Sequence, residues 1–491
     1  ISFFSGISKN EHIETNLVNL LHYKEVEMTG VYGLTPKNML DAVSFIEANI
    51  PFLQMLVEDV VMPQKAVELM PQILSGSSLK YIIDFRNLDK SEPILADSNS
   101  LADKFSSVAS KSTASSSSAS STSSTAAINN ADEKWCRNLI STVVPVNQDL
   151  LSAAQGKIDN KTKPLGSLGT LEDIAVQMSL IQQTLVPVIK NRSLFVFAGD
   201  HGITEEGVSA YPSEVTQQMV KNFLKGGAAI NVLCRHHNID MKIVDMGVNG
   251  DFDQFTTHPA FIDKKIRKGT RNFAIEPAMT YEELFLSIRH GMELFFDIKS
   301  DSKIEQIDIV GLGEMGIGNT TSASAIISTI TNITPEEASG RGTGIDNKGL
   351  KHKADIIKKA LDFHKPDPKD GFDILQKVGG YEIAGITGAV LAASSKGCAV
   401  VLDGVISTAA GLIAYIINPD IKGYLISGHK SVEFAQKAAL DYMGLKPVID
   451  FGMRLGEGTG AALTINTVEA ACKIMCEMAS FEDANVSGKA V

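Results

Sequence analysis

The sequence predicts an α/β protein whose core is a doubly wound, parallel β-sheet. Continuous apolar runs recur along the chain after about residue 190, and each run ends in glycine and polar residues. Such runs are typical of strands in a parallel sheet that is buried on both faces. Helix-like stretches separate the runs, and this alternation of strands and helices favours a doubly wound sheet.

The expected elements follow one another in chain order. The apolar runs are SLFVFAGDHG (193–202), MKIVDMGVNG (241–250), IDIVGLGEMGIGNTT (307–321), CAVVLDG (398–404), YLISGHK (424–430) and PVIDFGMRLGEGTG (447–460). Helix-like stretches lie at 282–296, 355–363 and 382–394. In doubly wound sheets, ligands bind beyond the carboxyl ends of the strands. Because Gly, Asp, Glu and His residues gather at these ends, we expect the functional site there.

Length and composition restrict the class of protein. A chain of 491 residues is expected to form about two to three folding units. The net charge of −12 argues against nucleic-acid binding and against a membrane surface, because both require clustered positive charge. Five cysteines are too few for a disulfide framework in so long a chain, which favours a cytoplasmic protein. Organelle targeting stays open because the chain starts at Ile1.

Residues 97–130 separate two parts of different composition. Ser, Ala and Thr dominate this segment, so burial of apolar side chains cannot offset its ordering entropy, and we expect a disordered linker. Residues 1–96 are expected to form a separate N-terminal module of unknown function. Within it the pattern predicts helices at 35–50 and 52–61 and a strand at 80–85.

The segment Gly311–Gly316 has the spacing G-x-G-x-x-G and follows an expected strand. Glu336 and Glu337 follow about twenty residues later, where a ribose-binding acid is expected in a dinucleotide site. One hypothesis is therefore an NAD(P)-dependent oxidoreductase. The pattern is short in a chain with forty glycines, and Glu314 places a carboxylate where a pyrophosphate would bind.

The next residues, 316–321 (GIGNTT), lead into a helix start rich in small residues. Free backbone N–H groups at a helix N-terminus, beside hydroxyl and amide side chains, are typical of a site for a single phosphate. A plain N-cap, in which Asn or Thr satisfies the helix donors, uses the same groups. Both interpretations stay open on the residues alone.

Three further loops carry candidate groups. Glu457 stands between two glycines at a strand end, where it can accept a proton from a bound nucleophile; an exposed turn glutamate is the alternative. Asp200 and His201 are either an acid–base pair or partners in a loop hydrogen bond. Lys348 and Lys353 are candidate phosphate ligands, although lysines are usually just solvated.

Taken together, five loops resemble those of the nicotinate-nucleotide:dimethylbenzimidazole phosphoribosyltransferase family. They are KPLGSLGTLE (163–172), FAGDHGITEEGVSAYP (197–212), GLGEMGIGNTT (311–321), GTGIDNKG (342–349) and MRLGEGTGAAL (453–463). The resemblance runs from about residue 133 to about 483. It implies a phosphoribosyltransferase region at 131–491 with a Rossmann-like large domain (about 190–455). A small helical domain would be built from both ends of this region (about 133–185 with 458–483).

The resemblance also implies an activity. Members of the family transfer the 5-phosphoribosyl group of nicotinate mononucleotide to 5,6-dimethylbenzimidazole, which gives α-ribazole 5′-phosphate and nicotinate for the lower ligand of cobalamin. The family is homodimeric, with the active site near the subunit interface, and neither a metal nor a cofactor is expected. A non-catalytic ligand sensor that retains these loops is a further hypothesis.

The family's site residues carry over onto matching positions. Glu457 corresponds to the general base of an inverting displacement, and Glu314 to a second glutamate near the bound base. The ribose phosphate is expected at Met315, Gly316, Asn319 and Thr320, with Lys353 preferred over Lys348 as its lysine. Tyr211 and Met219 fall where the family lines its benzimidazole pocket.

Overall fold

The computed structural model describes residues 59–61, 81–83, 125–296, 306–342 and 344–487, in two compact units that comprise residues 1–119 and 120–491. In the first unit, β1 (Asp59–Val61) pairs in parallel with β2 (Tyr81–Ile83). The strand expected at 80–85 is confirmed. The helix expected at 52–61 is wrong at its end, because 59–61 form a strand, as suits the two β-branched valines. The helix expected at 35–50 lies outside the described residues.

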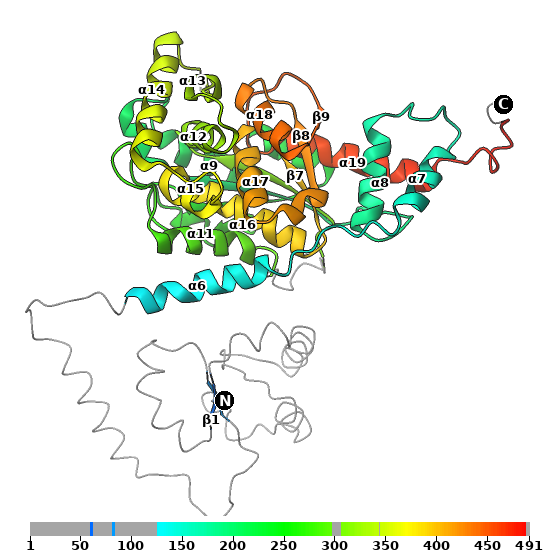
Figure 1. Ribbon diagram of the computed structural model, residues 1–491, viewed down its shortest axis with the longest axis horizontal. Helices are drawn as coiled ribbons and strands as arrows, with labels where there is room; N and C mark the ends of the chain where they lie inside the picture. The colour runs from blue at the N-terminus through cyan, green and yellow to red at the C-terminus, as the bar shows by residue number, and fades with distance from the viewer. Residues whose placement is uncertain (1–58, 62–80, 84–124, 297–305, 343, 488–491) are drawn as a thin grey trace, which may run out of the picture. The chain divides into compact units, whose positions relative to one another are not determined.

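The second unit contains a seven-stranded, fully parallel sheet (Figure 1). Its strands are β3 (Arg192–Gly199), β4 (Asp240–Gly247), β5 (Phe261–Asp263), β6 (Ile309–Met315), β7 (Ala399–Leu402), β8 (Leu425–His429) and β9 (Pro447–Ile449). The spatial order is β5-β4-β3-β6-β7-β8-β9. The chain starts in the middle with β3, winds outward through β4 and β5, and then returns to β6. The sheet is therefore doubly wound, as predicted, with its topological switch point between β3 and β6.

Each of the six apolar runs coincides with one strand of this sheet to within one residue at its start or lies around it. The seventh strand, β5, was not predicted because its three residues, FID, give too short a pattern. The three helix-like stretches match α11 (Tyr281–Glu293), α14 (Asn347–His364) and α16 (Tyr381–Ser395). In the described part of the chain, no helix is both long enough and apolar enough to cross a membrane.

Helices cover both faces of the sheet. Alternate residues of β3 point to opposite faces, so Phe195 and Phe197 belong to one buried core, and Leu194 and Val196 belong to the other. The first core contains residues of α11, α16, α12 (Asn319–Thr331) and α17 (Val405–Ile417). The second contains residues of α8 (Thr170–Ile181), α9 (Glu214–Leu224), α10 (Ala229–His237) and α19 (Thr459–Glu477).

The remaining elements connect these layers. They are α7 (Leu151–Asp159), α13 (Pro335–Ala338), α15 (Gly371–Val378), α18 (Phe434–Met443) and the 3₁₀ helices η1 (Gly202–Glu206), η2 (Asp253–Phe255) and η3 (Pro419–Tyr424). Helix α7 packs on α8, and α8 packs along α19. Both ends of the region therefore meet in one helical cluster, as the resemblance implied, although this cluster shares the second core with the sheet.

Helix α6 (Thr125–Ile140) corrects two expected boundaries. It begins inside the segment expected to be linker up to residue 130, and it packs against α11 and α16 rather than on α7 and α8. Cys136, Leu139 and Val143 are buried in the first core, and Arg289 forms a 2.5 Å ion pair with Asp132. Cys136 and Leu139 thus attach the C-terminal half of α6 to the first core.

Candidate active site

A cavity of about 860 Å³ opens at the carboxyl ends of β6, β7 and β8. Its lining comes mainly from α9 and from the loops that follow β3, β6, β7, β8 and β9, as expected for a site beside the switch point of a doubly wound sheet. Among the lining residues are eight of the predicted site residues: Tyr211, Met219, Glu314, Met315, Gly316, Asn319, Thr320 and Glu457. The ninth, Lys353, reaches the cavity wall through a hydrogen bond to Thr320.

The backbone around Glu457 is left-handed at three consecutive residues. The φ angles of Gly456, Glu457 and Gly458 are 83°, 63° and 89°. Glycine adopts such angles freely, whereas a glutamate there is strained, so this turn depends on its flanking glycines. The Asp403 carboxylate, just after β7, accepts hydrogen bonds from Gly458 N (3.1 Å) and Ala461 N (2.9 Å). Asp403 thus fixes the start of α19 and, with it, the position of Glu457.

The Glu457 side chain is buried in the cavity wall, with 6% of the residue exposed. Its Oε2 atom has no hydrogen-bond partner among the described residues. Burial, together with the nearby Asp403 carboxylate, raises the pKa of Glu457 to about 7. An exposed turn glutamate is therefore excluded, and the group is poised to take up a proton near neutral pH.

Glu314, at the end of β6, lies close to this turn. A Cβ atom on Gly456 would lie 2.7 Å from Glu314 Oε1, and the Asn319 side-chain amide donates to Glu314 Oε2. Burial raises the pKa of Glu314 well above its usual value, and the charges of Asp403, Glu382 and Glu457 add to the effect. These buried carboxyl groups form a site that favours protons and positively charged ligands.

The glycines of the G-x-G-x-x-G segment serve close packing. Gly311 and Gly313 lie inside β6, and a Cβ atom on Gly313 would lie 2.4 Å from Gly458 N. A Cβ on Gly316 would lie 2.3 Å from the Gly199 carbonyl oxygen. In a dinucleotide fingerprint these glycines belong to the turn after the strand. The position of Gly311 and Gly313 inside the strand removes the basis for the oxidoreductase hypothesis.

Replacement of Gly313 by alanine is expected to destabilise the protein by about 1–3 kcal/mol, because the added methyl group overlaps the Glu457 turn. The matched control is Gly156→Ala in α7, where the added methyl meets nothing within 4 Å. That change is expected to stabilise the helix by about 0.5–1 kcal/mol. Urea denaturation measures both, and equal stabilities of the two variants would contradict this account of Gly313.

The N-terminus of α12 forms the second part of the cavity wall. Its N-cap is Gly318, with φ 95°, and no side chain caps the helix. The Asn319 amide bonds to Glu314, and the Thr320 hydroxyl accepts a hydrogen bond from Lys353. The plain N-cap interpretation is therefore wrong. An uncapped helix N-terminus that faces a cavity is a favourable place for an anion.

Lys353 on α14 is 1% exposed, and its Nζ donates to Thr320 Oγ1 (2.9 Å) and to the Gly340 carbonyl oxygen (3.4 Å). Burial lowers its pKa to about 8, against the opposing effect of Glu433. Lys348, the alternative, is exposed on the first turn of the same helix. Of the two lysines, Lys353 is thus the one beside the helix N-terminus.

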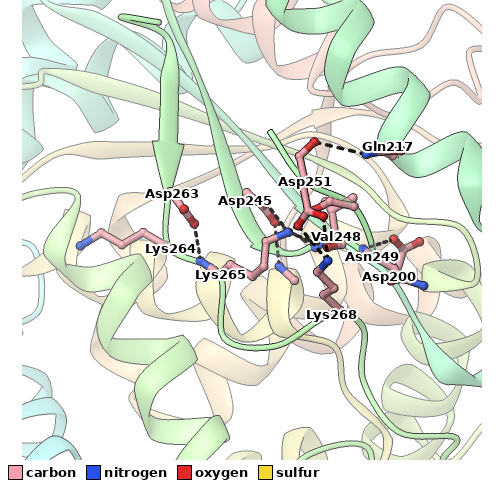
Figure 2. A network of polar contacts seen from close by, with 12 residues as sticks. Asp200, Gln217, Asp245, Val248, Asn249, Asp251, Asp263, Lys264, Lys265 and Lys268 are labelled. Carbon is pink, nitrogen blue, oxygen red and sulfur yellow. Dashed lines mark hydrogen bonds and ion pairs between the residues drawn. The ribbon is translucent and has the colours of Figure 1, made fainter. Parts of the chain in front are cut away.

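A polar network at the carboxyl ends of β4 and β5 holds the loop next to Asp200 (Figure 2). Lys265 forms a 2.9 Å ion pair with the buried Asp245 and donates to the carbonyl oxygen of Val248 at 2.7 Å. Asn249 N in turn donates to Asp200 Oδ2 at 2.7 Å. The Asp200 carboxylate therefore bonds to a neighbouring loop.

His201 turns away from this loop. Its Nε2 atom pairs with Glu382 Oε1 at 2.6 Å, and both side chains are fully buried. Neither Asp200 nor His201 is among the residues that line the cavity. These contacts favour the loop hydrogen bond over the acid–base pair for the Asp200–His201 sequence.

Asp403 and His429 are among the cavity residues that were not identified from the sequence. Asp403 directly follows β7, and His429 is the last residue of β8. Both occupy the strand-end position at which we expected the site, so a systematic scan of these positions would have identified them.

Comparisons with known proteins agree with this geometry. Residues 143–486 match a family model described as a phosphoribosyltransferase. A nicotinate-nucleotide–dimethylbenzimidazole phosphoribosyltransferase from Geobacter sulfurreducens is 47% identical over 348 residues, which are 71% of this chain and 97% of the relative. Its counterpart from Geobacter sp. strain M21 is 49% identical over 71% of this chain and 98% of the relative.

A solved structure is similar as well. The crystal structure of CobT from Thermus thermophilus aligns with a TM-score of 0.65 and 37% sequence identity, over 69% of this chain and 99% of that chain. All five cysteines of the present chain are free. The family match, the relatives and the loops around the cavity lead to one conclusion: the chain belongs to the nicotinate-nucleotide–dimethylbenzimidazole phosphoribosyltransferase family.

Proposed function

We propose that this protein transfers the 5-phosphoribosyl group of nicotinate mononucleotide to 5,6-dimethylbenzimidazole, forming α-ribazole 5′-phosphate and nicotinate. The names of its relatives support these substrates. The observation that carries the proposal is the buried Glu457 carboxyl, whose Oε2 lacks a partner among the described residues, in the same cavity as the uncapped N-terminus of α12. One cavity thus contains a proton acceptor and an anion site.

Glu457 acts as the general base. One nitrogen of the benzimidazole attacks the anomeric carbon of the ribose, and positive charge develops on the ring. A carboxylate at the other ring N–H stabilises this charge and then takes the proton. The departing pyridinium nitrogen becomes neutral nicotinate nitrogen and needs no acid. A single displacement inverts the anomeric centre, unlike the double displacement of a retaining glycosidase.

Asp403 supports this step through its charge, and Glu314 supports it as a buried carboxyl group that favours protons. Both carboxyls are buried near Glu457, where the low dielectric strengthens their effect on a developing cation. Glu314 also lines the cavity beside Met315, so it is suited to contact the bound base. Tyr211, Val215 and Met219 form an apolar part of the lining, which suits the dimethylated ring.

The phosphate of the substrate binds at Gly316, Asn319 and Thr320, with Lys353 as the cation. The helix N-terminus supplies N–H groups and a favourable dipole. Lys353 is suited to this role because its ammonium group already touches Thr320 from inside the protein. A bound phosphate would raise the lowered pKa of Lys353 and keep this group charged.

The direct test is turnover. Purified full-length protein is mixed with nicotinate mononucleotide and 5,6-dimethylbenzimidazole, and mass spectrometry detects α-ribazole 5′-phosphate. The absence of product would refute the proposal. Stabilisation of the protein by both substrates without turnover would instead favour the ligand sensor.

Replacement of Lys353 by methionine is expected to raise the KM for nicotinate mononucleotide about 10- to 100-fold, because a charge-assisted hydrogen bond to phosphate is lost. Lys348→Met on the same helix is the matched control and is expected to leave KM within about twofold of wild type, as for an exposed lysine. Steady-state kinetics at pH 7 measure both. A large effect of Lys348→Met alone would reverse the assignment.

We further infer that the protein is a homodimer, as the resemblance implies. Tyr211, Phe451 and Leu455, next to or in the cavity lining, are each more than half exposed, which suits a surface that a second copy covers. Sedimentation equilibrium tests the dimer, and a monomer at assay concentrations would contradict it.

The cytoplasmic location stays a prediction from the cysteine content.

A further inference from the structure

We propose that His429 is a positioning residue that holds the segment 450–456 and thereby places the Glu457 turn. The part of this proposal that concerns catalysis rests on the proposed function, whereas the part that concerns the segment does not. His429 ends β8, lines the cavity and is 4% exposed. It is not one of the residues to which the resemblance or the comparisons give a role.

The segment depends on side chains for its position. Residues 451–456 have no regular secondary structure, yet Met453, Arg454, Leu455 and Gly456 line the cavity directly before Glu457. The amides of Phe451 and Met453 both donate to His429 Nε2, at 3.0 and 3.3 Å. The amide between them, of Gly452, donates to Asp450 Oδ1 at 3.3 Å. Three consecutive backbone donors are thus bound by two side chains.

His429 is in contact with three neighbouring elements. Its backbone N donates to the Asp403 carbonyl oxygen (3.4 Å), and its carbonyl oxygen accepts from Gln436 Nε2 (2.9 Å). A Cβ atom on Gly460 would lie 2.5 Å from His429 Cβ, so α19 packs directly against the histidine. His429 therefore connects β7, α18 and α19 to a segment without regular secondary structure.

This role requires a neutral imidazole. An Nε2 atom that accepts hydrogen bonds carries no proton, so the proton of the neutral ring lies on Nδ1. Protonation of Nε2 converts the acceptor into a donor and breaks both bonds to the segment. Burial lowers the pKa of His429, and the nearby Asp450 opposes this effect.

The charged groups around the histidine come from several elements. Asp450 forms a 2.9 Å ion pair with Lys430, which is adjacent to His429 in the chain. The carboxylate of Asp403 lies near Gly460, on the side of α19.

Because the folded-state pKa of His429 is lowered, its hydrogen bonding to the segment is complete at neutral pH. It is lost as the pH falls through the folded-state pKa, below the usual value of about 6.5.

Amide hydrogen exchange of the ligand-free, full-length protein tests the structural part without any assay of activity. In His429→Ala the amides of 451 and 453 are expected to lose protection at pH 7.5, while those of β6 and α19 keep it. His429→Gln is the matched variant, because its side-chain oxygen accepts the same two bonds and does not titrate. Unchanged protection of 451 and 453 in His429→Ala would overturn the proposal.

Kinetics and pH test the consequence for catalysis. We expect kcat/KM to fall about tenfold in His429→Ala, the effect of one or two lost hydrogen bonds, and to stay within about twofold of wild type in His429→Gln. As the pH falls from 7.5 to 5.5, protection of 451 and 453, corrected for intrinsic exchange, should decrease in wild type but not in His429→Gln. An equal decrease in both proteins, or equal kinetic losses in both variants, would overturn the proposal. Exchange that behaves as expected in a protein without turnover would refute only the proposed function.

Discussion

Replacing Glu457 with glutamine is expected to lower kcat by about 10²- to 10⁴-fold, the usual contribution of a positioned general base. Glutamine keeps the size of the side chain and its left-handed turn between two glycines, but it cannot take the benzimidazole proton. Since the variant retains the anion site at α12, the KM for nicotinate mononucleotide is expected to change little. A rate within about threefold of wild type would remove Glu457 from the mechanism.

The pH profile gives an independent readout of the same residue. The base works only when ionised, and the pKa of Glu457 is raised to about 7 by burial and by Asp403. In wild type, log kcat/KM is therefore expected to rise with pH up to about 7 and then to level off. This limb is expected to disappear in Glu457→Gln. Because any titration of the benzimidazole itself is common to both proteins, the ratio of the two profiles isolates Glu457.

Replacing Glu314 with glutamine is expected to stabilise the ligand-free protein at pH 8 by on the order of 1–3 kcal/mol while it lowers activity. The pKa of Glu314 is raised well above its usual value by burial and by the carboxyls of Asp403, Glu382 and Glu457. The folded state therefore binds more protons than the unfolded state between about pH 4.5 and the folded-state pKa. In this window stability falls as pH rises, and a neutral glutamine removes the loss.

Thermal unfolding of both proteins from pH 5 to pH 8 measures this effect. The wild type should lose stability over this range, whereas Glu314→Gln should show a flatter curve and a higher Tm at pH 8. Glu336→Gln, at an exposed position on α13, is the control and is expected to leave stability within about 0.5 kcal/mol. A lower Tm for Glu314→Gln at pH 8 would show that the carboxylate is stabilising, contrary to this account.

The fold class could be predicted from the sequence because parallel strands buried on both faces leave a plain signal. Six of the seven strands of the sheet coincide with continuous apolar runs to within one residue at the start or lie within them, and the helices between them have the expected spacing. The exceptions are instructive. Strand β5 is too short to give a pattern, and α6 is preceded by a Ser- and Ala-rich segment whose composition hides the start of the helix.

The candidate site could also be placed largely from the sequence, since its residues follow strands and gather at one edge of the sheet. Glu457 was identified from its glycine-rich loop and Glu314 from the resemblance, and the cavity contains both. The partner of each group could not be read from the sequence. Asp403 and His429 act through hydrogen bonds to backbone amides of distant segments, and such contacts leave no local pattern.

The sequence alone thus determined the doubly wound sheet and the loops that carry the two glutamates, because period, apolar content and glycine spacing are local properties. Only the tertiary structure showed that Lys353 contacts Thr320 at the start of α12 while Lys348 is exposed, that no side chain caps this helix, and that Gly313 packs closely against the Glu457 turn. It also determined that the pKa values of Glu457 and Glu314 are raised. Burial and the approach of charges from distant strands determine these properties, and both arise only when the sheet brings its strand ends together.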